Sequence, residues 1–73
     1  MKVIIEFYRV RDLDSAHAVL GRVTCDAIDT EAAIGLAKSL SYSLDMPQEP
    51  DNVSIYDNEG RQLYCAAVKS MNL

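Results

Sequence analysis

Apolar and β-branched residues alternate with polar ones at both ends of the chain, a period of two that is typical of half-buried strands. Near the start, the alternation predicts a strand over residues 2–11 and, after a polar connector, a second strand over residues 18–28. Near the other end it predicts short strands over residues 53–56 and 61–68. Gly60 lies in the connection between these two, where a hairpin turn needs a residue with positive φ.

The middle of the chain changes to the period of a helix. Asp29 is a good N-cap, and the helix that it starts is expected to run to Ser43 or Leu44. Two prolines stop any further helix, so residues 46–52 are expected to form a loop. The apolar stripe of the helix, at i, i+3, i+4, i+7 and i+11 spacing, consists of Ala33, Leu36, Ala37, Leu40 and Leu44.

The order strand, strand, helix, strand, strand predicts one α+β domain over residues 1–73. It has two layers, a four-stranded antiparallel sheet and one helix on one face of it. Gly21 in the second strand marks a bulge or a close backbone contact. The strand residues expected to face the helix are Val3, Ile5, Phe7, Val19, Val23, Cys25, Val53, Ile55, Leu63 and Cys65.

A single helix leaves the other face of the sheet uncovered, and this face is the first candidate functional surface. Tyrosine and arginine are enriched at protein interfaces, and large exposed apolar patches usually mark contacts. We therefore expect an interface with a protein partner or a second copy. Its residues are Ile4, Tyr8, Val10, Leu20, Arg22, Tyr56 and Tyr64, with Val68 beside them. The alternative is a half-solvated antiparallel sheet that carries amphipathic side chains.

The net charge of −4 arises from 11 acidic and 7 basic residues, and there is no run of Lys or Arg. This balance disfavours direct nucleic-acid binding, which normally needs a basic face. The acidic net charge has two explanations. It increases solubility, or it favours contact with a basic partner surface. If both hairpin turns lie at one end of the sheet, four carboxylates form an acidic rim there. They are those of Asp12, Asp14, Asp57 and Glu59. Residues 57–60 also have a simpler explanation as turn chemistry.

The sequence offers little for catalysis or for a cofactor. Cys25 and Cys65 are the two cysteines and His17 is the one histidine, too few ligands for a structural zinc site within the chain. Both cysteines are expected to point inward as small apolar residues. His17, close to Ser15 and to acidic residues, is read as a solvated loop histidine, because the connector does not fix the geometry that a base needs. We therefore predict no catalytic residue, no metal, no cofactor and no binding cleft.

The chain also lacks the sequence signals of membrane insertion and export. Its uncharged stretches are far shorter than the roughly 20 residues of a spanning helix. The apolar start breaks at Glu6, too early for a secretion signal. We expect a cytoplasmic protein without a membrane partner.

One segment resembles a known group of proteins. The stretch from Val23 through Asp29 to Ala33, continuing to Ala37 and Lys38, is similar to the strand-to-helix junction of small phage and bacterial proteins. The anti-CRISPR inhibitors of type I CRISPR complexes are among them, and they share the small size and a closing hairpin such as residues 57–66. The resemblance implies a non-catalytic inhibitor, encoded by a mobile element, that docks on a CRISPR surveillance complex in a bacterial host.

Two other classes stay open at this point. The first is a small bacterial homodimeric domain with an antitoxin-like or housekeeping role, joined through the uncovered sheet face. The second is a small enzyme or metal binder.

If the protein is instead the CRISPR inhibitor, its acidic surface would engage the Lys/Arg groove of the complex that normally holds nucleic acid.

Overall fold

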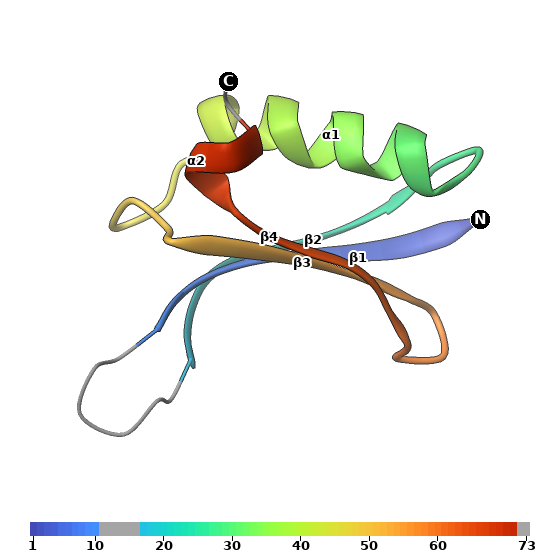
Figure 1. Ribbon diagram of the computed structural model, residues 1–73, viewed down its shortest axis with the longest axis horizontal. Helices are drawn as coiled ribbons and strands as arrows, with labels where there is room; N and C mark the ends of the chain where they lie inside the picture. Colours follow the sequence, from blue (N-terminus) through green and yellow to red (C-terminus); the bar gives the residue numbers. More distant parts are fainter. Residues whose placement is uncertain (11–16, 72–73) are drawn as a thin grey trace.

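The computed structural model describes residues 1–10 and 17–71. In chain order the elements are β1 (Lys2–Val10), β2 (His17–Asp26), α1 (Thr30–Ser43), β3 (Asn52–Asp57), β4 (Gln62–Ala67) and the single helical turn α2 (Val68–Met71). The four strands form one antiparallel sheet, and α1 lies across one of its faces (Figure 1). The predicted fold class and element order are therefore confirmed. The turn α2, which replaces the expected end of the last strand at Val68, was not predicted.

The spatial order of the strands is β2-β1-β3-β4, so the first strand of the chain is central. The 14 residues of α1 span about 20 Å, which carries the chain back along the sheet after β2 ends. As a result β3 begins beside Tyr8, near the end of β1, and reaches Val3 with its last residue, Asp57. The end of β1 at Val10, opposite His17, and the end of β3 at Asp57 therefore lie at opposite ends of the sheet.

The core lies between α1 and the sheet. The side chains of Val3, Ile5, Phe7, Val53 and Ile55 are completely buried there, as predicted. From the helix, Ala33 and Ala37 are also completely buried, and residues this small let the helix lie close to the strands. Leu40 and Leu44 pack against the same cluster, again as predicted. Leu36 does not, since 37% of it is exposed, and Ile34 contacts the core in its place.

The N-terminus of α1 forms as the sequence predicts. Asp29 has extended backbone, with φ −155°, and its Oδ1 accepts a hydrogen bond from the Ala32 backbone N–H at 2.8 Å. We expect Asp29→Ala to lower the free energy of unfolding by about 1 kcal/mol, because a first-turn amide then loses its acceptor. Urea unfolding followed by circular dichroism measures this, and an unchanged midpoint would show that the cap contributes nothing.

Gly35 gives the opposite prediction within the same helix. It is exposed, and a Cβ built on it meets no atom within 4 Å. Glycine loses more conformational freedom than alanine when the chain folds into a helix. Gly35→Ala is therefore expected to raise the free energy of unfolding by about 0.5–1 kcal/mol. The same urea titration checks this value, and a lower midpoint would contradict it.

A β-bulge shifts the pairing of β1 with β2. Phe7 lies opposite Gly21, but Tyr8 lies opposite Val19, which leaves Leu20 without a direct partner. Val19 thereby turns away from α1 and is 48% exposed, so its expected place in the core is wrong. Gly21 was predicted to mark a bulge or a close contact, and it does both. It adjoins the bulge, and a Cβ at this position would come within 2.9 Å of Leu44 Cδ2.

A second bulge shifts the pairing of β3 with β4. Ile55 lies opposite Tyr64 and Tyr56 lies opposite Gln62, with Leu63 left over. From that point the alternation of β4 is reversed relative to the expectation. Tyr64 faces the core, not the uncovered face, and Cys65 lies opposite Ser54 on the uncovered face. Val68 was also expected on that face, but it begins α2 and is buried in the core.

Candidate protein-binding face

The outer face is the side of the sheet that α1 does not cover. The register of the strands assigns its side chains, which alternate with those of the core and reverse at each bulge. They are Lys2, Ile4, Glu6, Tyr8 and Val10 of β1; Val19, Arg22, Thr24 and Asp26 of β2; Asn52, Ser54 and Tyr56 of β3; and Gln62, Cys65 and Ala67 of β4.

The structure places five of the seven residues predicted for the interface on this side of the sheet, although one of them, Tyr8, is buried and only 5% exposed. They are Ile4, Tyr8, Val10, Arg22 and Tyr56. Tyr64 lies on the opposite face of the sheet, so its placement was wrong, and Leu20 stands at the bulge, where the register assigns it to neither face. Val19 and Cys65 also lie on the outer face, although both were predicted to face the core.

Three side chains form a hydrogen-bonded cluster in the middle of the outer face. Tyr8 Oη lies 3.4 Å from Cys65 Sγ, and Ser54 Oγ donates a hydrogen bond to Tyr8 Oη at 3.4 Å. Because β3 separates β1 from β4, the tyrosine side chain must cross β3 to reach the cysteine. The small side chain of Ser54 leaves room for this crossing and is itself only 1% exposed.

This cluster alters the acidity of two of its members. The hydrogen bond from Tyr8, followed by that from Ser54, stabilises the thiolate and holds the pKa of Cys65 below its ordinary value, against the smaller opposing effect of burial. Burial, and after it the hydrogen bond to Cys65, raises the pKa of Tyr8. Cys65 is exposed, whereas Cys25 is half-buried and contacts the core. The expectation that both cysteines point inward is thus wrong for Cys65.

The thiol chemistry can be measured directly. We expect iodoacetamide to alkylate Cys65 faster than Cys25, with a rate that reaches half its maximum at a pH below the ordinary thiol pKa. In Tyr8→Phe the thiolate loses a hydrogen-bond donor, so this midpoint should move to higher pH and alkylation near neutral pH should slow. Mass spectrometry of peptides at a series of pH values separates the two cysteines. A midpoint unchanged by Tyr8→Phe would contradict the assigned cause.

The outer face carries four charges, two of which form an ion pair. Arg22 donates to Glu6 Oε2 through Nε at 3.0 Å and through Nη2 at 2.7 Å. The same two residues lie opposite each other in the register of β1 and β2, as do Lys2 and Asp26. The outer face therefore carries two cations and two anions, and it is neutral.

The predicted acidic rim needs the ends of β1 and β3 to lie at one end of the sheet, but Val10 and Asp57 lie at opposite ends, so this premise is wrong. Asp12 and Asp14 lie outside the described residues. The Asp57 side chain stabilises the hairpin turn through hydrogen bonds, in line with the simpler explanation given for residues 57–60. Its Oδ1 accepts from the Glu59 and Arg61 backbone N–H groups, each at 2.9 Å, and its Oδ2 accepts from Arg61 Nε.

The same contacts explain the electrostatics of this turn. The backbone N–H of Arg61, more than any other contact, lowers the pKa of Asp57. Glu59 Oε2 lies 3.0 Å from Arg61 Nη2, so both carboxylates of the turn share one guanidinium. Gly60, with φ 86°, supplies the left-handed residue that was predicted.

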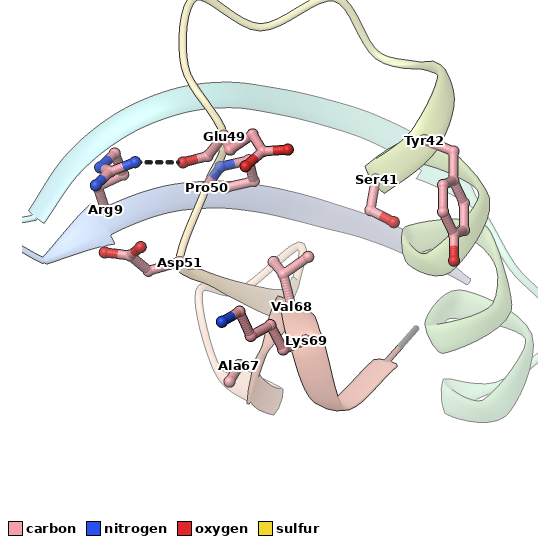
Figure 2. Close-up of a pocket in the computed structure, with 9 residues that line it drawn as sticks. All are labelled: Arg9, Ser41, Tyr42, Glu49, Pro50, Asp51, Ala67, Val68 and Lys69. Atoms are coloured by element: carbon pink, nitrogen blue, oxygen red, sulfur yellow. Dashed lines mark hydrogen bonds between the residues drawn. The ribbon is translucent and has the colours of Figure 1, made fainter. Parts of the chain in front are cut away.

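A groove of about 590 Å³ lies near the end of β1, where the C-terminal part of α1, the following loop and α2 meet (Figure 2). No cleft was predicted from the sequence, so that expectation is wrong. Arg9 Nη1 donates to the Glu49 carbonyl at 2.8 Å, and Val68 N donates to the Asp51 carbonyl at 2.9 Å, so the loop is tied to β1 and to α2. The groove is lined by Arg9, Ser41, Tyr42, Glu49, Pro50, Asp51, Ala67, Val68 and Lys69. Two cations and two anions balance along its walls, so its charge selects no class of ligand.

Within residues 1–10 and 17–71, no three His, Cys, Asp or Glu side chains lie close enough together to hold a metal ion. None of the helices in the described part of the chain has the length and apolarity needed to cross a membrane. No model of a protein family, no curated protein and no solved structure matches this chain.

Proposed function

We propose that this protein is a non-catalytic protein-binding module and that its outer face is the binding surface. The observation that carries the proposal is the one-sided cover of the sheet, since α1 packs on one face alone (Figure 1). On the other face Val10 and Val19 are 39% and 48% exposed, and Ile4 and Tyr56 are half-buried. Apolar and tyrosine side chains grouped on one surface favour contact with another protein.

The chemistry around Cys65 supports a role without catalysis. The groups hydrogen-bonded to the thiol are the hydroxyls of Tyr8 and Ser54. A hydroxyl does not accept a proton at neutral pH, and the raised pKa of Tyr8 makes its ionised form rarer still. The arrangement stabilises a thiolate, but it provides no general base for a reaction cycle.

The neutrality of the outer face shapes the kind of contact that it favours. Glu6 and Arg22 satisfy each other, so the face presents paired charges beside its apolar residues. Such a surface favours a partner through shape and apolar burial rather than through attraction to a basic groove. This removes the acidic rim from the proposal and leaves the sheet face as the working surface.

Site-specific photo-cross-linking tests the proposal. A benzophenone amino acid replaces Tyr56 on the outer face, and in a matched control it replaces Tyr42, which is 69% exposed on α1. Irradiation of cells that make the protein should produce a cross-linked species from position 56 and none from position 42. A cross-link from position 42 alone, or none from either position, would refute the outer face as the binding surface.

The resemblance to anti-CRISPR inhibitors adds a narrower hypothesis within this proposal. Its support is the strand-to-helix junction around Asp29, now seen as a capped helix, together with the α+β fold of a 73-residue chain. In this version the partner is a subunit of a type I CRISPR complex in the cytoplasm of a bacterial host. Target-DNA binding by a purified complex, titrated with this protein, should fall in proportion to the amount added. Full binding at a large excess would exclude the hypothesis.

A further inference from the structure

We propose that the occupant of the outer face is a second copy of this chain, which packs face to face with the first. The inference rests on the proposed function, because it names the partner of the same surface. Three properties of the outer face favour a second copy: its charge, the pairing of its polar groups, and its area.

The first property is the distribution of charge. The protein carries a net charge of −4, yet the outer face, with Lys2 and Arg22 against Glu6 and Asp26, is neutral. The whole net charge therefore belongs to the rest of the sequence. Two copies repel each other through that remainder, and the repulsion between surfaces in contact is smallest when the neutral faces meet. A strongly basic or acidic partner would gain nothing from this particular face.

The second property is the pairing of polar groups. Glu6 is held by two hydrogen bonds from Arg22, and the hydroxyls of Tyr8 and Ser54 bond within their own cluster. In the described part of the chain, no buried side-chain nitrogen or oxygen lacks a hydrogen-bond partner. The polar groups of this cluster and of the ion pair are therefore already satisfied, so a facing copy can cover them without leaving them unpaired.

The third property is area. Four strands about 4.8 Å apart, with a rise of about 3.3 Å per residue, present a face on the order of 400–600 Å². Two such faces bury about 1,000 Å² in total, which is near the lower limit for a specific interface. The exposed side of α1, about 20 Å by 10 Å, offers less than half of this area. The outer face is thus the surface with enough area for a dimer, and the dimer should be weak, with a Kd of about micromolar order or higher.

Sedimentation equilibrium over about 5–500 µM protein tests the inference. The wild type should shift from a mass of 8.1 kDa toward twice that mass as its concentration rises. Tyr56→Glu places a charge in the interface and should stay monomeric. Tyr42→Glu, the matched control on α1, should dimerise like the wild type. Thr24→Glu is a second outer-face variant whose side chain is exposed, so it tests the surface even if Tyr56→Glu fails to fold. Circular dichroism verifies the fold of each variant.

Two results would overturn the inference. The first is a wild type that stays monomeric throughout, and the second is a dimer that folded Tyr56→Glu and Thr24→Glu leave intact, for example one joined at the edge of β4. A monomer whose position 56 still cross-links to a different protein would refute the second copy while the proposed function stands. A dimer insensitive to both variants, combined with no cross-link from position 56, would refute both.

Discussion

Replacing Phe7 with alanine is expected to remove most of the stability of this protein. Phe7 is completely buried in the central strand, opposite Gly21 on β2 and Val53 on β3. A buried Phe→Ala change costs about 3–5 kcal/mol, because apolar contacts are lost and a cavity remains. A domain of 73 residues has about 4–11 kcal/mol in total, so the variant should be partly or wholly unfolded at room temperature.

Urea unfolding, followed by circular dichroism, measures this effect. Tyr42→Ala is the control, since it also removes an aromatic ring but from a side chain that is 69% exposed, and it should change the free energy of unfolding by about 0.5 kcal/mol or less. If Phe7→Ala and Tyr42→Ala had equal effects, the assignment of the core to the α1 side of the sheet would be wrong.

The second large effect is expected when a small buried residue is replaced by a larger one. Ala37 is completely buried where α1 approaches the sheet, and Ala33 lies one turn before it with the same burial. A leucine at position 37 needs space that the close approach of helix and strands does not leave. Overpacking of this kind costs about 1–3 kcal/mol, so Ala37→Leu should lower the free energy of unfolding despite the good helix propensity of leucine.

Lys38→Leu is the matched control, because it adds the same residue one position along on the exposed side of α1. The control should unfold within about 0.5 kcal/mol of the wild type. If Ala37→Leu were as stable as Lys38→Leu, α1 would have to pack more loosely on the sheet than the burial of its two alanines indicates.

The local elements could be predicted because each has a chemical signal in the sequence. Asp29 caps a helix through its carboxylate, and Gly60 adopts the positive φ that the hairpin turn requires. The alternation in β1 places Val3, Ile5 and Phe7 on one face, and no bulge interrupts these three residues. Fold class followed from these signals because two hairpins and one amphipathic helix have few ways to form a shared core.

The two bulges account for most of the misplaced residues, because their effect on the faces of the strands was not predicted. A bulge adds one residue to one strand, which reverses the face of every side chain beyond it. Gly21 gave a hint of the first bulge, but nothing in the sequence around Leu63 marks the second. Its consequence is physical, because the large Tyr64 turns toward the core while the small Cys65 takes a place beside Tyr8.

The acidic rim failed for a reason of topology, not of local structure. Carboxylates in two hairpin turns share one end of a sheet when the hairpins follow one another in spatial order. Here α1 returns the chain along the sheet, β3 pairs with β1, and the turn at Asp57 lies beside Val3. The groove near Arg9 was missed for a similar reason, since its walls come from segments that are distant in the sequence.

If the outer face is the binding surface, its methyl groups change environment when a partner binds, and methyl NMR detects this change. The methyl groups of Ile4 and Val19 lie on the outer face, while those of Leu36 and Ile28 are exposed elsewhere. Spectra of the free protein are compared with spectra of its complex, whether with a second copy at high concentration or with a captured partner. We expect the chemical shifts of the Ile4 and Val19 methyl signals to change and those of Leu36 and Ile28 to remain the same. Shifts confined to Leu36 and Ile28 would contradict it.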